Sequence, residues 1–169
     1  MALIVEDGSI VAGANSYASV AQADAYHADR LNAEWAALAT DGKESALIKA
    51  TDYLEQTYAD AWKGYRVDAD QPLSWPRYDV IAYTYPFPAD SVPLALRNAA
   101  IELALKASKG PLLCDEGQRV KRKKVDVLET EYDTYSSPQK RYTAVQRALA
   151  PYLTNSVGSG IQVVRLERA

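Results

Sequence analysis

The side chains that most often perform catalysis are scarce in this chain. One histidine, His27, and one cysteine, Cys114, occur among 169 residues. A metal centre of several histidines and a mechanism that needs two of them are therefore excluded. His27 falls within a helical pattern, where we expect it on the helix surface. Cys114 precedes Asp115 and Glu116, an acidic setting that disfavours a reactive thiolate, so we expect a structural role for it.

Motifs for phosphate binding and for a serine nucleophile are also missing. The sequence contains neither a Walker-type loop nor a Gly-x-Gly-x-x-Gly pattern, and it has no Gly-x-Ser-x-Gly elbow. Carboxylate pairs such as Asp126 with Glu129 could do acid-base work or hold a metal. No partner of defined geometry accompanies them, and a solvated charged arm explains them more simply. We expect no cofactor, no metal site and no enzymatic activity.

A basic run is the strongest candidate for contact with phosphates. Five cations occur in six residues, and they are our DNA-facing candidates: Arg119, Lys121, Arg122, Lys123 and Lys124. Such a run can neutralise the backbone of a nucleic acid. The alternative is a solvated arm whose charges balance the acidic stretch that follows, and the net charge of −3 favours this alternative.

Aromatic residues, glycine and proline form the second notable pattern. Twelve tyrosines accompany three tryptophans and one phenylalanine, and tyrosine suits half-buried positions and subunit contacts. Trp75 can fill a core or interface pocket, and Pro76 fixes the backbone before Arg77. The guanidinium of Arg77 would then pair with a carboxylate or with carbonyl groups. We group these residues as a structural motif: Trp62, Gly64, Trp75, Pro76 and Arg77.

Hydrophobic spacing predicts four helices that must position these residues. The first opens at Ser19, with Gln22 in capping-box position, and runs to about Thr40; the second is capped by Asp41 and ends near Ala59. The third is capped by Asp90 or Ser91 and stops at Gly110-Pro111. The fourth starts at Ser136-Ser137-Pro138 and carries the stripe Tyr142, Val145, Leu149 and Tyr152. Residues 61–88 read as a long irregular connection held by aromatic packing.

The remaining segments read as extended. Residues 1–18 form an extended lead with a hairpin-type turn at Asp7-Gly8. Residues 112–136 suggest an extended arm or β hairpin, and residues 156–169 a strand-like tail on a Gly/Ser joint. The tail could add a strand to a partner's sheet, so its candidate interface residues are Ile161, Val163, Val164, Arg165 and Leu166.

The sequence thus predicts one mainly α domain over residues 1–169. A four-helix bundle-like core at about 19–153 would carry the arm and the extended termini. The length suits one domain with a sizeable core. No stretch is typical of a signal peptide or a membrane span, and the lone cysteine weakly favours a reducing compartment. We expect a cytoplasm-like environment and no membrane partner.

Several segments, in order, resemble the tailed-phage head-to-tail adaptor proteins, also called head completion or connector proteins. Related sequences are often labelled DnaT-like single-stranded-DNA-binding proteins. The resemblance covers residues 14–105 well and the last third loosely. The segments that carry it are Ala14–Tyr17, Ser19, Ala23–Tyr26, Lys43-Glu44, Ala46–Ile48, Ala50–Leu54, Trp62–Gly64, Gln71–Arg77, Val92-Pro93 and Ala99–Ala104. The chain departs from the family after Arg77, where Tyr78-Asp79 and the Tyr/Pro-rich stretch 83–88 intervene.

The resemblance implies a non-catalytic structural subunit of a homo-oligomeric ring, typically a dodecamer. Such a ring sits in the virion neck, assembled in the host cytoplasm. Its partners would be the portal protein and a tail or neck protein such as the tail terminator, with DNA passing through the lumen and contacted non-specifically. The alternative is a DnaT-like single-stranded-DNA-binding protein, in which Arg119–Lys124 and stacked tyrosines supply affinity.

Overall fold

The computed structural model describes residues 2–113, 122–125, 128–131 and 142–154. The described helices are α1 (Val20–Ala28), α2 (Ala33–Ala36), α3 (Thr40–Tyr58), α4 (Leu94–Ala107), α5 (Thr143–Leu149) and the short 3₁₀ helix η1 (Ala150–Tyr152). The described strands are β1 (Tyr65–Arg66), β2 (Arg77–Tyr78), β3 (Ile81–Ala82), β4 (Tyr85–Pro86), β5 (Arg122–Val125) and β6 (Leu128–Glu131). They pair as three antiparallel two-stranded sheets, β1 with β2, β3 with β4 and β5 with β6.

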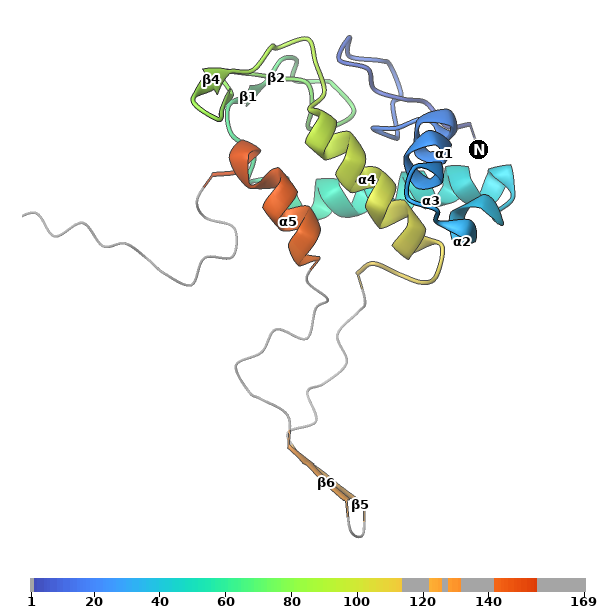
Figure 1. Cartoon of the computed structure of the whole chain (residues 1–169). Helices are drawn as coiled ribbons and strands as arrows, with labels where there is room; N and C mark the ends of the chain where they lie inside the picture. The colour runs from blue at the N-terminus through green and yellow to red at the C-terminus, as the bar shows by residue number, and fades with distance from the viewer. Residues whose placement is uncertain (1, 114–121, 126–127, 132–141, 155–169) are drawn as a thin grey trace, which may run out of the picture.

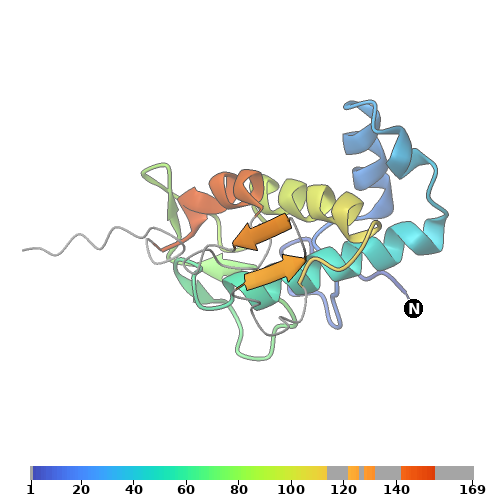
Figure 2. The same cartoon turned by 90° about the horizontal axis from the view of Figure 1, so that it is seen from below.

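The core lies where α4 packs against α3 on one side and α5 on the other (Figures 1 and 2). Leu47 and Leu54 of α3 are fully buried, as are Leu96 and Leu103 of α4. Their spacing of seven residues returns each pair to one face of its helix, which is why the hydrophobic pattern predicted these faces correctly. Leu149 of α5 closes the core from the far side of α4.

The first predicted helix is split, and the prediction of one helix to Thr40 is wrong. The capping box at Ser19 and Gln22 is confirmed, but α1 ends at Ala28. Leu31 has a φ of 54°, in the left-handed region that stops a helix. The N–H of Leu31 donates to Ala28 O, and the N–H of Asn32 donates to His27 O, so the turn satisfies its own backbone. The chain then enters the short α2.

Two predicted caps are also wrong. α3 begins at Thr40 after the extended Ala39, with no side-chain cap, and Asp41 lies inside the first turn. The negative charge of Asp41 suits the helix N-terminus there without a capping bond. α4 begins after Pro93, with neither Asp90 nor Ser91 as its cap, since the fixed φ of proline already prepares the helix.

The N-terminal lead is a loop wrapped around one buried carboxylate, not the expected hairpin. Glu6 accepts hydrogen bonds from the N–H groups of Gly8, Ile10 and Val11 at 2.8, 3.1 and 2.9 Å. The only pairing recorded here is a parallel bridge between Val5 and Ser16. The Asp7-Gly8 turn signal is real, but the carboxylate satisfies the backbone that a second strand would otherwise pair.

Residues 61–88 contain two small hairpins, where the sequence suggested an irregular connection. The predicted aromatic packing is present: Trp75 meets Trp62, Phe87 and Tyr152 edge to face, with ring centroids 5.6–5.9 Å apart. The β1–β2 and β3–β4 hairpins lie at one end of the helical core, and α1 and α2 lie at the other (Figure 1).

The described part of the chain is therefore mainly α, with small sheets. The four-helix bundle stays a prediction, as does the start of the last helix at Ser136–Pro138, which lies outside the described residues. The expected arm contains the β5–β6 hairpin. Among the described residues, no helix combines the length and apolarity needed to cross a bilayer.

Candidate functional site

The segment Gln71–Arg77 forms a mostly buried base beneath the hairpins. The Trp75–Pro76 peptide bond is cis. Arg77 is buried, and its guanidinium donates to three backbone carbonyls: Nε to Lys63 O at 2.8 Å, Nη1 to Ser74 O at 3.2 Å and Nη2 to Gly64 O at 2.7 Å. The planar fork of arginine suits this convergent set of acceptors.

The same arrangement requires a glycine at position 64. Its φ is +66°, and a Cβ at this position would lie 2.1 Å from Tyr78 O, a contact that no side chain tolerates. The structure thus brings together all five residues of the sequence motif, because Trp62 packs on Trp75 and Gly64 accepts from Arg77. In the described structure their contacts are internal, so they position the hairpins.

Glu55 of α3 joins this base to the N-terminal segment. Tyr17 Oη donates to Glu55 Oε1 at 2.5 Å, while the N–H and Oγ of Ser74 donate to Oε2 at 2.9 and 2.6 Å. Burial, together with the neighbouring Glu55 charge, raises the pKa of Tyr17 well above its usual value, so this phenol remains a donor. Sequence reasoning missed Glu55, because one carboxylate on a helix carries no local signal of a partner 38 residues away.

The two hairpins carry five large exposed side chains, which together we call the tyrosine surface: Tyr65, Tyr78, Ile81, Tyr83 and Tyr85. These side chains are between 44% and 73% exposed. Tyr65 and Tyr78 are cross-strand partners in β1–β2, and their rings lie 5.5 Å apart with a tilt of 34°. Tyr83 lies in the β3–β4 turn with its ring edge-on to Tyr152. Large apolar groups left exposed on neighbouring elements mark candidate interaction sites.

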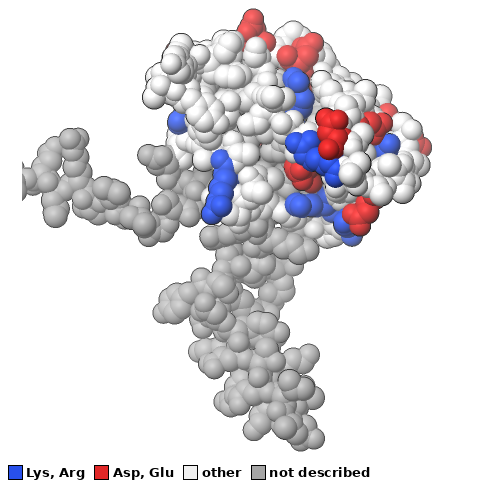
Figure 3. All heavy atoms as spheres, viewed as in Figure 1, with Lys and Arg blue, Asp and Glu red and all other residues white. Residues whose placement is uncertain are grey.

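The cations beside the tyrosine surface are bound to backbone. Lys63 Nζ donates to Ile81 O at 3.2 Å and to Pro151 O at 2.7 Å, and Arg66 donates to Gln71 O. Three exposed carboxylates, Asp68, Asp70 and Asp79, lie in the same segment. On the face shown in Figure 3, Lys and Arg atoms lie in separate groups among white and red atoms, without a continuous basic band.

Part of the basic run is described, in β5. The register sets Arg122 opposite Glu131 and Lys124 opposite Glu129. Opposite charges at cross-strand positions favour a hairpin, so this register agrees with the charge-balanced arm as well as with a DNA contact. Arg119 and Lys121 lie outside the described residues. So do the candidate interface residues of the tail, Ile161, Val163, Val164, Arg165 and Leu166.

His27 is buried, and the expectation of a surface position is wrong. Only 1% of it is exposed, and its ring stacks at 4.7 Å on Trp35. Asn32 Nδ2 lies 2.9 Å from Nδ1, and Nε2 lies 3.3 Å from Ile101 O. With Asn32 as donor, the neutral imidazole donates from Nε2, so His27 ties α1 to α4. The sequence around His27 predicts a surface position because the residues that bury it belong to other elements and leave no local signal.

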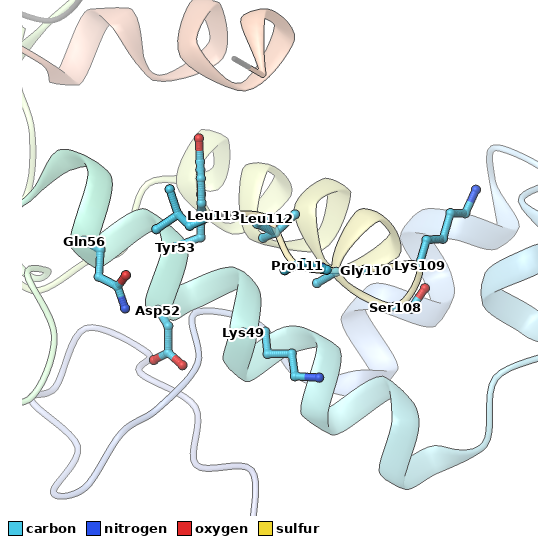
Figure 4. A pocket seen from close by; sticks show the side chains of 11 residues that line it. Lys49, Asp52, Tyr53, Gln56, Ser108, Lys109, Gly110, Pro111, Leu112 and Leu113 are labelled. Atoms are coloured by element: carbon cyan, nitrogen blue, oxygen red, sulfur yellow. The ribbon is translucent and has the colours of Figure 1, made fainter. Parts of the chain in front are cut away.

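A hollow of about 510 Å³ lies between α3 and the segment after α4 (Figure 4). Tyr53, Leu112 and Leu113 form its apolar part, and Lys49 and Asp52 extend from α3. Its lining includes no histidine or cysteine. Within the described ranges, no three His, Cys, Asp or Glu side chains converge to hold a metal ion. We therefore take the tyrosine surface as the candidate site.

A family model matches residues 1–169, the whole chain, and its description is "Putative DnaT-like ssDNA binding protein". No curated protein matches the chain, and no solved structure does.

Proposed function

Because the chain belongs to this DnaT-like ssDNA-binding family, we propose that it binds single-stranded DNA through the tyrosine surface. The observation that carries the proposal is the exposed, mutually stacked pair Tyr65 and Tyr78. Every unpaired base has a π-face, and aromatic side chains provide sequence-tolerant platforms for it. The mostly buried segment Gln71–Arg77, with Gly64, holds both hairpins in place before a ligand arrives. This lowers the conformational entropy that is lost on binding.

Phosphate contacts would come mainly from β5, because the cations beside the tyrosines already donate to carbonyls. Arg122, Lys123 and Lys124 are the described candidates. Each phosphate that a cation neutralises on a single strand contributes about −0.7 to the slope of log K against log salt. Replacing all three with alanine should therefore make that slope less negative by roughly 2, if all three contact the strand.

The test is the affinity of the full chain for a fluorescein-labelled oligothymidylate, followed by anisotropy. The double variant Tyr65→Ala/Tyr78→Ala should weaken binding by about 1–3 kcal/mol for each base that loses its platform, roughly 5- to 150-fold in Kd. The matched control Tyr65→Phe/Tyr78→Phe keeps both rings and should bind like the parent. Equal binding by the alanine and phenylalanine pairs would remove the tyrosine surface from the proposal.

A second candidate is a non-enzymatic ring subunit of a phage neck, which the sequence resemblance implied. One observation favours it: three exposed carboxylates lie in the same segment as the tyrosine surface, and the neighbouring Lys63 and Arg66 already donate to carbonyls. This setting suits a protein partner better than phosphates. In this candidate, the surface contacts a neighbouring copy, the portal or a tail protein. DNA then passes through the lumen of a ring, typically a dodecamer, in the virion neck.

Cosedimentation separates the two candidates. The purified chain is mixed with a matching portal ring, and in parallel with single-stranded DNA at low and physiological salt. Stable portal association with no DNA binding that survives physiological salt would support the ring subunit, and the opposite result would support DNA binding. A variant without residues 160–169 tests whether the tail, with Ile161–Leu166, docks on the portal; retained docking would contradict that role.

A further inference from the structure

Leu31 is the most exposed large apolar side chain in the described residues, with 91% of its surface open to solvent. It lies in the turn between α1 and α2; we call residues 28–36 the corner. Its φ of 54° places a branched side chain in the left-handed region, where it crowds the backbone. Glycine or asparagine would make this turn with less strain. A residue that is both strained and exposed points to a contact outside its own chain.

The corner also contains a recess beside Leu31. This hollow has a volume of about 510 Å³. Leu31, Trp35 and three alanines form its apolar lining, and Asp24, His27, Asn32 and Lys43 form the polar remainder. The same patch therefore combines a protruding apolar side chain with a recess that is apolar on one part of its lining. Such a patch is complementary to itself, which is the requirement for a two-fold contact between identical chains.

The charges beside Leu31 fit the same symmetry. Asp29 and Arg30 are consecutive, exposed and opposite in sign. Arg30 is held in place, because its Nη1 donates to Tyr26 O at 3.0 Å and its guanidinium carbon lies 3.4 Å from the centre of the Tyr26 ring. A two-fold axis that passes between Asp29 and Arg30 would set each charge of one copy against the opposite charge of the other.

We propose that two copies of this chain pair through the corner about a two-fold axis, with Leu31 of each copy filling the recess beside Leu31 of the other. Arg30 of each copy faces Asp29 of the other. This pairing goes beyond the proposed function and requires neither DNA nor a portal. The patch is small beside those of stable complexes, so the dimer is weak and forms at high protein concentration.

The first test is sedimentation velocity of the full chain over a concentration series. The parent should shift from monomer to dimer as concentration rises, while Leu31→Gly and Leu31→Asn stay monomeric with an unchanged or higher thermal midpoint, since both relieve the strained turn. Leu94→Ala is the matched control, because Leu94 is also exposed, at 64%, on another element. A parent that stays monomeric, a series that continues beyond the dimer, or Leu31→Gly dimers of parental strength would each overturn the proposal.

The second test uses charge reversal to examine the two-fold pairing. Asp29→Arg and Arg30→Asp should each weaken self-association at least tenfold, because like charges then meet across the axis. Mixing the two variants should restore dimers, as heterodimers with opposite charges in register. A mixture no stronger than either variant alone would contradict the contact between Asp29 and Arg30.

Discussion

Arg77 shows how one buried cation can organise a surface that it does not itself reach. Its three hydrogen bonds end on carbonyls of Lys63 and Gly64, just before β1, and of Ser74, in the connection between β1 and β2. A charged donor strengthens each of these bonds, and the burial of the group makes the loss of any of them costly. The buried Arg77 therefore helps to set the distance between the exposed side chains of Tyr65 and Tyr78.

At this scale, Arg77→Lys should destabilise the chain by roughly 1–3 kcal/mol, because an ammonium group cannot meet three acceptors in the plane of a guanidinium. Urea unfolding followed by tryptophan fluorescence measures the change. Arg147→Lys is the control, since Arg147 is exposed on α5, and its effect should stay within about 0.5 kcal/mol. Equal effects of the two changes would mean that the carbonyl contacts of Arg77 contribute little.

At the scale of elements, the α1–α2 corner is attached to α4 through His27. Burial lowers the pKa of His27, with the Arg30 charge adding a little, while the hydrogen bond to Ile101 O and the charges of Glu102 and Asp24 oppose that shift. The folded state therefore holds its proton less tightly than the unfolded chain. The stabilisation is present above the unfolded value of 6.5 and is lost as the pH falls from there toward the folded pKa.

The parent should thus lose unfolding free energy as the pH falls below 6.5, the unfolded value, and His27→Gln should lose much less over the same range. The chain has one histidine, so its ring proton resonances titrate without overlap and report the folded pKa directly. Carboxylates whose lowered pKa does not depend on His27, such as Asp7, affect both proteins equally and cancel in the comparison. A midpoint at or above 6.5 would contradict the cost of burying the charged ring.

The elements differ in how far the sequence predicts them. The apolar faces of α3 and α4 follow from spacing, because helix periodicity is local and strong. The break at Leu31 does not, since leucine is a good helix former and the turn depends on His27, Asn32 and Trp35 packing together. The β1–β2 and β3–β4 hairpins are two residues per strand, too short for alternation to be visible. The candidate site shows the same limit: the Trp-Pro-Arg segment and the abundant tyrosines were visible, but which tyrosines stay exposed depends on tertiary packing.

At the scale of the whole molecule, the chain leaves and re-enters the helical core at one place. Leu113 and Tyr53 line the same hollow (Figure 4). The Tyr142 ring meets Tyr53 edge to face, with centroids 5.4 Å apart. The residues after α5 are also attached to the core by backbone hydrogen bonds. The N–H of Lys63 donates to Tyr152 O, and the N–H of Thr154 donates to Ala61 O. Both sides of residues 114–141 are therefore anchored by the core itself.

Replacing residues 114–141 with a short Gly/Ser linker should leave the helical core folded. Circular dichroism should show the helix signal of α1–α5 retained, and the thermal midpoint should change by only a few degrees. The same variant lacks β5, so it should also lose the salt-dependent part of DNA affinity while keeping the tyrosine surface. Loss of cooperative unfolding would show that the replaced segment contributes to the core.

The convergence of Leu113 and Tyr142 on Tyr53 has a consequence in polymer terms. When the two ends of an insert are already held close, lengthening it costs only the slow logarithmic growth of loop-closure entropy, about 0.6 kcal/mol for each doubling. The core therefore places almost no thermodynamic limit on how long this insert is. The folded core should therefore tolerate inserts of very different lengths between Leu113 and Tyr142. A foreign peptide or a whole reporter domain could be inserted at this point.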